Sequence, residues 1–355
     1  MMKLSRFIQL PVGATPHVEV VVPCYNYGHY LPQCVESILS QAGVRTTVTI
    51  VDDASTDDSA LVAERLAGAH QGVRLIRNEA NLGHIRTYNV GLREADSDYV
   101  VLLSADDMLA PGALWRAAAL MEANPTVGFT FGHAQKFVTE PSPRTPMPTV
   151  TWATWRGAEW IGLQMRRGWN NISSPEAVVR TTVQHAVGYY NPDLPHSGDV
   201  EMWLRIAAVA DVGHVNGVDQ AYYRRHASNL STGYSGYRDI EERWKAYEGF
   251  LSQWSRTNDA ARLGAVMRRR LSDEVLFDLQ RDLDRAEVPA DRVDWILELA
   301  NRIDPEVVGR GPWTDVRVRR LGGRPRGISP AMRSAGRELA AWTRWHRWRR
   351  FRYLG

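Results

Sequence analysis

The sequence predicts an α/β fold in which helices flank a sheet, followed by a mainly helical C-terminal extension. Short apolar runs alternate with helical patterns through the first 110 residues, and these runs are continuous and rich in β-branched residues. From residue 239 to about 303 the pattern is mostly helical, with many charged positions. Continuous apolar strands alternating with helices indicate a parallel sheet that is covered on both faces.

The individual elements follow from the same patterns. The expected strands are 18–22, 48–51, 73–76, 99–103, 127–131, 213–218 and 221–225. The expected helices are 29–41, a segment capped by Ser55 or Thr56 and ending near 66, then 83–93, 111–123, 175–185 and 200–210. Four prolines predict a loop at 141–148, whereas the Trp- and Gly-rich residues 151–171 give no clear pattern. Residues 309–327 read as a Gly/Arg-rich linker, and Ser329-Pro330 opens a last helix.

Composition indicates a globular protein that remains in a reducing compartment. The 355 residues are 44% hydrophobic and 23% charged, and no apolar run reaches the about 18 residues that a transmembrane helix needs. The first ten residues lack the features of a secretory signal. Two cysteines, Cys24 and Cys34, provide neither a disulfide framework nor a metal cluster. We therefore expect a cytoplasmic protein in which the two thiols serve packing.

Polar clusters follow the first four expected strands. They are Pro-Cys-Tyr-Asn-Tyr-Gly (23–28), the acidic run 52–58, the segment 78–84 with Arg86 and Asn89 beyond it, and Ser-Ala-Asp-Asp (104–107). Ligands of open parallel sheets bind beyond the carboxyl ends of the strands, so the clusters predict one site. No Gly-rich phosphate loop follows the first strand.

Asp106 and Asp107 are the candidate metal residues. Two adjacent carboxylates at a strand end repel each other unless a cation lies beside them, and a hard divalent cation can join them to diphosphate oxygens. An isolated Asp pair at a strand–helix turn is more often a helix cap. The three companion clusters favour the ligand site instead.

Four motifs in this order resemble the family 2 inverting glycosyltransferases. They are Val-Val-Val-Pro-Cys-Tyr-Asn-Tyr (20–27), Ile-Val-Asp-Asp-Ala-Ser-Thr-Asp (50–57), Asn-Leu-Gly-His-Ile-Arg-Thr-Tyr-Asn (81–89) and Leu-Leu-Ser-Ala-Asp-Asp (102–107). The resemblance covers residues 16–230 and implies a GT-A type, Rossmann-like mixed sheet. It implies a catalytic domain at 1–235, with a nucleotide-binding half at 16–110 and an acceptor half at 111–235. A helical extension would follow at 236–307, and a basic linker and tail at 308–355.

The resemblance also implies roles for individual residues. Pro23 and Tyr25 would line the nucleoside, with Tyr25 stacking near the base, and Asp53 would accept from a pyrimidine ring, which favours UDP over dTDP. The residues implied to border the nucleotide and its phosphates are Asn26, Asn81, Gly83, Arg86, Ser104 and Asp106.

The metal role is implied chiefly for Asp107, with Mn²⁺ or Mg²⁺ as the ion. The family's common D-x-D triplet has an acid where this chain has Ser104. That departure shifts the metal role toward Asp107 and leaves Asp106 as a contact to ribose or metal. A later segment, Tyr-Tyr-Arg-Arg-His (222–226), resembles the family's closing motif. It implies that His226 is a ligand of metal or diphosphate, and that Arg224 or Arg225 is a phosphate partner.

Asp199 is the preferred general base for deprotonating the acceptor hydroxyl. The segment Gly-Asp-Val-Glu-Met-Trp-Leu-Arg (198–205) resembles the family's acid-before-helix motif, and a helix N-terminus stabilises a carboxylate. Glu201 is the alternate base, although it faces a different side of the helix. As a structural alternative, Asp199 is only an N-cap. Residues 170–176 lie where relatives shape the acceptor side, or form an ordinary polar loop.

The C-terminal tail is basic and rich in Trp. Residues 308–355 hold 13 Arg against two acidic residues, a net charge of +11, whereas the whole chain carries +3. Within 329–355, Leu339, Trp342 and Trp345 recur at three-residue spacing, which favours an interfacial helix on an anionic membrane, here the inner face of the cell membrane. Packing on the acidic body, nucleic-acid binding and absence of fixed structure compete with that interpretation, and nucleic acid is disfavoured.

The leading hypothesis is therefore metal-assisted, inverting transfer of a sugar from a nucleoside-diphosphate sugar to a hydroxyl of a glycan or lipid-linked acceptor, in polysaccharide or glycoconjugate synthesis. A nucleotidyltransferase is one alternative, but its Gly-rich basic loop is missing. A non-catalytic glycan-binding protein on a transferase fold is another. The sequence leaves the sugar, the acceptor and the oligomeric state open.

Overall fold

The computed structural model describes residues 2–6, 15–142, 150–229, 233–234, 236–254, 257–285 and 288–321. The chain divides into two compact units. The first comprises Met1–Ile161 with Asn170–Gly233, and the second comprises Gly162–Trp169 with Tyr234–Gly355. The 329–355 segment, for which the sequence predicts membrane contact, lies outside the described residues.

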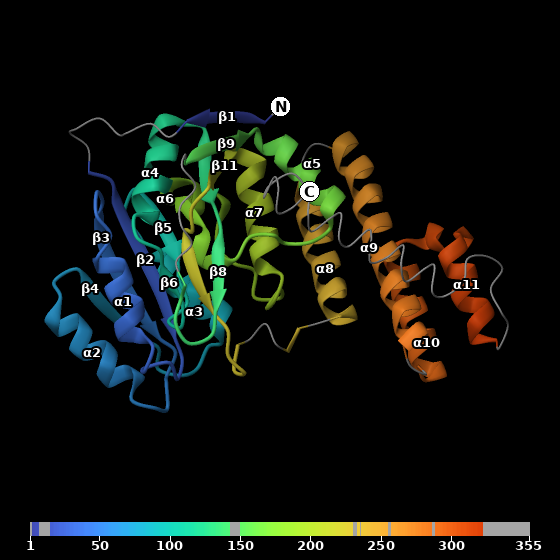
Figure 1. Ribbon diagram of the computed structural model, residues 1–355, viewed down its shortest axis with the longest axis horizontal. Coiled ribbons are helices and arrows are strands. Elements are labelled where there is room, and N and C mark those ends of the chain that lie inside the picture. Colours follow the sequence, from blue (N-terminus) through green and yellow to red (C-terminus); the bar gives the residue numbers. More distant parts are fainter. Residues whose placement is uncertain are drawn as a thin grey trace. The chain divides into compact units, whose positions relative to one another are not determined.

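A nine-stranded mixed sheet forms the centre of the first unit (Figure 1). In spatial order its strands are β1 (Lys3–Arg6), β9 (Thr151–Trp155), β11 (Asp211–Asn216), β7 (Val127–Phe131), β10 (Val178–Arg180), β5 (Tyr99–Leu102), β2 (His17–Cys24), β3 (Arg45–Asp52) and β4 (Val73–Arg77). Strands β5, β2, β3 and β4 are parallel, whereas β10 runs antiparallel between β5 and β7. The predicted mixed α/β fold is confirmed.

Helices cover both faces of the parallel half of this sheet, as the continuous apolar strands require. Val20 and Val22 lie in one core cluster with Leu31 of α1 (Leu31–Leu39). Val21 points to the other face, where α3 (His84–Arg93) packs. A Cβ atom at Gly91 of α3 would lie 2.3 Å from Val21 Cγ1, so only glycine permits this close approach.

Other helices complete the two layers. Helix α2 (Ser59–Ala69) packs on β3 and β4, and α4 (Ala113–Ala123) packs on β7 and β11. Helix α7 (Gly198–Val209) packs on β7 and on α6 (Thr181–Val187), and α5 (Gly157–Arg167) follows β9. A separate three-stranded sheet joins β6 (Met108–Leu109), β12 (Ala221–Arg224) and β8 (Ala134–Phe137).

Several boundaries differ from the predictions. Helix α2 begins at Ser59, so Ser55 and Thr56 do not cap it. The helix expected at 175–185 is divided into a 3-10 turn, η1 (Ser174–Glu176), strand β10 and helix α6. Strand β10 forms because Val178 and Val179 pair with β5 and β7, a tertiary constraint that overrides local propensity. The unassigned residues 151–171 contain β9 and most of their remainder is α5.

Helices α8 (Tyr237–Gln253), α9 (Thr257–Arg285), α10 (Ala290–Ile303) and α11 (Gly311–Arg320) form most of the second unit, with a 3-10 segment η3 (Pro305–Gly309). The helical extension expected at 236–307 agrees with these elements. The linker expected from residue 308 does not, because α11 forms there and buries Trp313 and Val316. A proline in its first turn favours that helix start.

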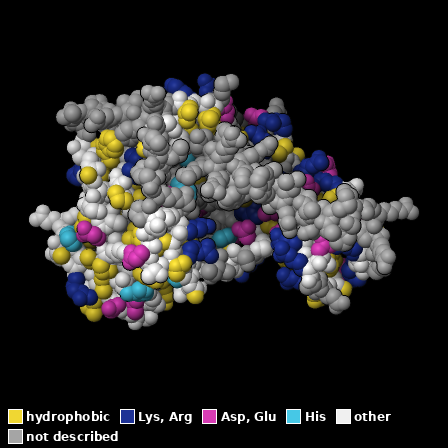
Figure 2. Space-filling model, viewed as in Figure 1, with side chains coloured by type: hydrophobic (Ala, Val, Ile, Leu, Met, Phe, Trp, Pro, Cys, Tyr) yellow, Lys and Arg dark blue, Asp and Glu magenta, His cyan; other side chains and the backbone are white. Residues whose placement is uncertain are grey.

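Charged side chains of both signs cover this unit, and Figure 2 shows Lys and Arg interspersed with Asp and Glu. Arg310 pairs with Asp273 and Asp304, and Arg319 pairs with Asp284. Among the described residues, no helix combines the length and apolarity that crossing a membrane requires.

Candidate active site

The predicted polar clusters lie along one edge of the sheet. Strands β2, β3, β4 and β5 are parallel, and Cys24 at the end of β2 is the register partner of Asp52 at the end of β3. The segments that follow these strands therefore begin at the same edge. The structure therefore brings to one edge the residues of separate motifs that the sequence predicts to border a nucleotide.

Asp53 orders the loop after β4. Its buried carboxylate accepts from Asn78 Nδ2 (2.8 Å), from Leu82 N (2.8 Å) and from Gly83 N (3.0 Å). Asn81 Oδ1 also accepts from Gly83 N, which has a positive φ of 79°. Three of the roughly four acceptor positions of the Asp53 carboxylate are thus used within the chain. The remaining one, on Oδ2, is the position open to a base, and the base contact stays a prediction.

Asn26 holds the loop after β3. Its Oδ1 accepts from Thr56 N at 2.8 Å and from Asp57 N at 3.3 Å, while its own N–H donates to Ser55 Oγ. Asn26 and Ala54 both adopt positive φ, at 58° and 56°. Such strain in non-glycine residues persists only where surrounding contacts enforce it, and it gathers at functional sites.

The residues on either side of Asn26 differ in exposure. Tyr25 is 44% exposed, so its ring face is available for stacking, whereas Pro23 is buried within β2. On α3, Arg86 is exposed and its guanidinium has no ion pair or hydrogen bond within the described part of the chain. An unpaired, exposed Arg beside this strand edge supplies the positive charge that a phosphate ligand needs.

Asp106 and Asp107 lie in the turn between β5 and β6. Asp106 Oδ2 accepts from His226 Nε2 at 2.9 Å and from Asn229 Nδ2 at 3.3 Å. Asp107 Oδ1 accepts from the Arg224 N–H at 2.9 Å. Burial raises the pKa of both carboxyls, and the neighbouring charge of Asp106 raises that of Asp107 further. His226, for which the sequence predicts a contact with metal or diphosphate, touches the acidic pair through Asp106.

Arg224 has a structural role at this pair. Its Nε donates to the Asp106 carbonyl at 2.9 Å and its Nη2 donates to Gln33, while the guanidinium carbon lies 4.6 Å from the Tyr30 ring centroid. This buried Arg is fully engaged, so exposed Arg225 is the better candidate for contacting phosphate. Ser104 contributes its carbonyl, which accepts from Asp107 N, and its hydroxyl, which bonds to Tyr88.

The donor set at this turn fits a divalent metal. No cluster of three or more His, Cys, Asp or Glu side chains forms a ready metal cage in the part of the chain that the structure describes. Mg²⁺ and Mn²⁺ sites that handle phosphate esters do not need one, because one or two carboxylates and the phosphate oxygens suffice. Two buried, mutually repelling carboxylates also leave a charge imbalance that a cation would relieve. Asp107 and Asp106 would hold the metal, and His226 is the nitrogen donor beside them.

Asp199 lies in the first turn of α7, as expected. Its Oδ2 accepts from Ser174 Oγ at 2.7 Å, and the Tyr190 hydroxyl also bonds to its carboxylate. Burial raises the pKa of Asp199 above the ordinary value, and the two hydroxyl donors partly oppose that rise. A partly exposed carboxyl with a raised pKa suits a general base.

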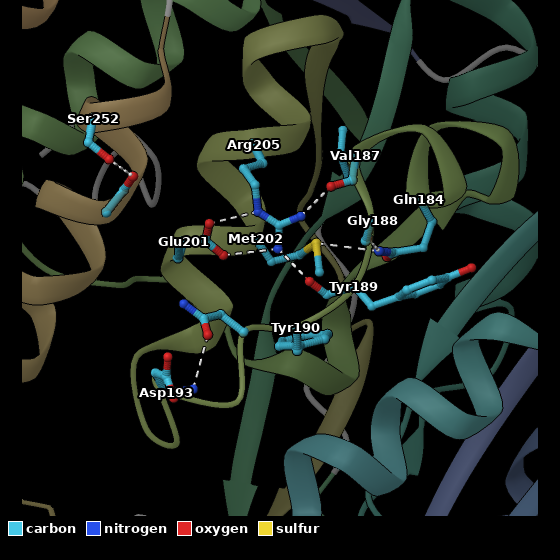
Figure 3. A network of polar contacts seen from close by, with 12 residues as sticks. Gln184, Val187, Gly188, Tyr189, Tyr190, Asp193, Glu201, Met202, Arg205 and Ser252 are labelled. Atoms are coloured by element: carbon cyan, nitrogen blue, oxygen red, sulfur yellow. Dashed lines mark hydrogen bonds and ion pairs between the residues drawn. The ribbon is translucent and has the colours of Figure 1, made fainter.

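Glu201 has a different environment, shown in Figure 3. Its Oε1 accepts from Arg205 Nε at 2.7 Å and its Oε2 accepts from Arg205 Nη2 at 2.9 Å. The same guanidinium donates to the carbonyls of Val187 and Tyr189. Because the carboxylate is buried and held by this fork, Glu201 fixes the loop before α7 and is not placed as a base.

Three further residues of this site received no role from the sequence: Ser174, Tyr190 and Tyr88, although Tyr88 lies within the motif at 81–89. The first two donate to Asp199, and Tyr88 bonds to Ser104 while its ring meets that of Tyr190 at 5.8 Å. Ser174 belongs to the 170–176 segment considered for the acceptor side, but no spacing rule connects it to a residue 25 positions later. Tyr190 carries no local motif.

The fold and this site together define a glycosyltransferase of the GT-A type. The family model "Glycosyl transferase family 2" matches residues 19–175. An uncharacterized protein of Mycobacterium tuberculosis (strain CDC 1551 / Oshkosh) is 30% identical over 240 residues, which are 62% of this chain and 70% of the relative. The chain belongs to glycosyltransferase family 2.

Solved structures share the fold at low sequence identity. S. aureus TarS 1–349 in complex with UDP-GlcNAc superposes with a TM-score of 0.63 at 16% identity, covering 88% of this chain and 95% of that one. The mannosyltransferase PcManGT from Pyrobaculum calidifontis, in complex with GDP-Man and Mn²⁺, gives a TM-score of 0.52 at 17% identity, covering 87% and 88%.

Proposed function

We propose that this glycosyltransferase moves a sugar from a UDP-linked donor to a hydroxyl of a glycan or lipid-linked acceptor, with inversion and with help from Mn²⁺ or Mg²⁺. One observation carries the proposal: the buried carboxylate pair Asp106 and Asp107 follows β5, and Asp199 is bonded to Ser174, which lies before β10, the antiparallel neighbour of β5. All three acids therefore belong to the sheet edge that carries Tyr25 and Asp53. The carboxylate pair would serve the departing nucleoside diphosphate, and Asp199 would serve the attacking hydroxyl. These are the two opposite ends of one displacement at the anomeric carbon.

The donor side rests on two exposed Arg side chains, an exposed aromatic ring and three buried carboxylates. Tyr25 offers a ring face to the base, Asp53 one acceptor position, and Arg86 with Arg225 positive charge for phosphate. Asp107 and Asp106 would hold the cation, which when bound neutralises charge on the departing nucleoside diphosphate. The complexes of TarS with UDP-GlcNAc and of PcManGT with GDP-Man and Mn²⁺ support a nucleotide-sugar and a metal here by analogy.

The acceptor side rests on Asp199. A hydroxyl that attacks the anomeric carbon must lose its proton, and Asp199 takes that proton when it is ionised. A single displacement with the nucleoside diphosphate leaving from the opposite face inverts the anomeric configuration. The basic, Trp-rich sequence of residues 329–355 supports an acceptor at an anionic membrane, and this part of the proposal rests on sequence alone.

The test combines donor binding with turnover. The wild-type protein is expected to show a UDP-sugar-dependent thermal shift that needs Mn²⁺ or Mg²⁺, and to release UDP from at least one sugar of a panel. Asp199→Asn should keep the thermal shift and lose about 10²- to 10⁴-fold in kcat. Asp291→Asn, at an exposed position of α10, is the matched control.

A separate measurement tests the proposed inversion of the anomeric configuration. The anomeric configuration of the product, measured by NMR coupling, should be opposite to that of the donor. If no nucleoside diphosphate binds with metal present, or if the configuration is retained, the proposal is wrong.

A further inference from the structure

Asn89 binds the backbone of Tyr190 across 101 residues of sequence. Its Nδ2 donates to the Tyr190 carbonyl at 2.8 Å, and its Oδ1 accepts from the Tyr190 N–H at 2.9 Å. Both halves of the buried Asn89 amide are thereby paired with one residue. The Asn89 amide satisfies both the N–H and the C=O of Tyr190, as the backbone of a neighbouring strand would, and so fixes this residue in position.

Tyr190 in turn contacts the candidate base. Its hydroxyl bonds to the Asp199 carboxylate, and its ring packs edge-on against Tyr88 of α3 at 5.8 Å between centroids. A second bond from α3 holds the same segment, because the ring Nε2 of His84 lies 2.7 Å from the Pro195 carbonyl. Helix α3 therefore fixes the segment before Asp199 at two points.

The other side of this segment is fixed as well. Arg205 donates to the carbonyls of Val187 and Tyr189 (Figure 3), directly before Tyr190. Arg205 and Asn89 thus hold the same Tyr189–Tyr190 peptide group from different helices, Arg205 at its C=O and Asn89 at its N–H. The position of the Tyr190 hydroxyl follows from this arrangement, because the backbone has little freedom left.

The N-terminal end of α3 reaches the donor side. The loop 78–83 that leads into the helix is ordered by three hydrogen bonds to Asp53. Gly91 lets the helix pack directly on Val21 of the sheet, so α3 is fixed on the β-sheet near its other end. One helix of ten residues therefore connects the Asp53 loop with the Asp199 segment.

We propose that Asn89 is a positioning residue for sugar transfer: by fixing Tyr190 it orients the hydroxyl that holds Asp199. This inference rests on the function proposed above. Asn89 touches neither donor nor acceptor in this role; it acts through Tyr190.

The test uses the full chain and three variants. Asn89→Ala removes both bonds to Tyr190, and we expect kcat to fall by about 10- to 100-fold, since misplacing a reacting group by about 1 Å costs that much. Because Asp199 also loses a hydroxyl donor that favours its ionised form, the ascending limb of the pH–kcat profile should shift to higher pH. The Kd for the UDP-sugar with Mn²⁺ should stay within about twofold, since Asp53 keeps its bonds.

Tyr190→Phe separates orientation from folding. It leaves the Asn89 contacts intact, removes only the hydroxyl, and should shift the pH limb in the same direction. The double variant should be no worse than Asn89→Ala alone, because both act through one hydroxyl. Asn124→Ala is the matched control: this Asn also bonds a backbone carbonyl, that of Leu120, but precedes β7 at the opposite edge of the sheet.

The outcomes separate the two proposals. Absence of donor turnover in the wild-type protein contradicts the proposed function itself. A wild-type enzyme that turns over while Asn89→Ala keeps its kcat and pH profile overturns the inference. So does an unshifted limb in Tyr190→Phe, or effects of the two variants that multiply in the double variant.

Discussion

The Ser174 hydroxyl donates a 2.7 Å hydrogen bond to the Asp199 carboxylate, joining the 3-10 turn η1 to the first turn of α7. Glu201, two residues further along α7, instead has both carboxylate oxygens bound by Arg205. Two acids of one helix turn thus have opposite environments. The Asp199 carboxylate interacts with two hydroxyl groups, whereas both oxygens of the Glu201 carboxylate accept hydrogen bonds from one guanidinium.

The pH dependence of transfer is expected to follow Asp199. The base acts only when ionised, and burial raises its pKa, so the ascending limb of kcat should lie above the pH at which an ordinary aspartate titrates. Ser174→Ala removes a donor that favours the ionised form, which should move the limb to still higher pH. Ser252→Ala, which removes an exposed hydroxyl from α8, should leave the limb in place. A limb that moves downward in Ser174→Ala would contradict the assignment.

The thermal stability of variants should distinguish the structural role of Glu201 from the proposed catalytic role of Asp199. Glu201→Gln leaves the Arg205 guanidinium without its carboxylate, and breaking a buried pair costs about 3–5 kcal/mol. We expect a clearly lower Tm, measured by thermal unfolding, with any loss of activity following from that loss. Asp199→Asn should keep its Tm and lose kcat. Glu241→Gln, which breaks the more exposed pair with Arg302, is the control and should change stability by less than about 1 kcal/mol.

Asp107→Asn should trade stability against ligand binding. The wild-type protein buries two repelling carboxylates in neighbouring positions, so replacing one by a neutral isostere should keep or raise the Tm without ligands by a few degrees. The amide oxygen still accepts from Arg224 N. The metal-dependent shift with UDP, however, should disappear. A variant that retains that shift would exclude Asp107 as the principal metal ligand.

The parallel half of the sheet was predictable because its signals are local. Residues 18–22 and 48–51 are rich in β-branched residues, and the polar clusters come directly after them, so the parallel order of the strands gathers the site. Strand β10 was not predictable, since three residues become a strand only when β5 and β7 offer their edges. Strands β6, of two residues, and β8, of four residues, are also short and depend on pairing with β12.

The residues of the site also divide into those with a local sequence signal and those that depend on contacts distant in sequence. Asp106, Asp107 and Asp199 were found because motif positions mark them, whereas Ser174, Tyr190 and Asn89 act through bonds that span 9 to 101 residues for which no spacing rule exists. One further signal lies in the sequence: Glu201 and Arg205 are four residues apart on a helix, a spacing at which opposite charges pair. That spacing predicts the ion pair that engages both Glu201 carboxylate oxygens, and it therefore favours Asp199 as the base.

Glu176 should make the protein less stable at alkaline pH. Burial raises the pKa of this carboxyl to about 8, from 4.5, while its Oε1 accepts from Ser173 N within η1. Between these values the folded protein keeps a proton that the unfolded chain releases, so the stabilisation is complete below about pH 4.5 and declines as the pH rises through 8. Glu176→Gln cannot ionise and keeps the acceptor oxygen. Thermal unfolding should therefore show its Tm several degrees above wild type at pH 8 and close to wild type at pH 4.5, whereas exposed Glu298→Gln should show no such divergence. Equal Tm differences at both pH values would mean that Glu176 is ionised in the folded protein.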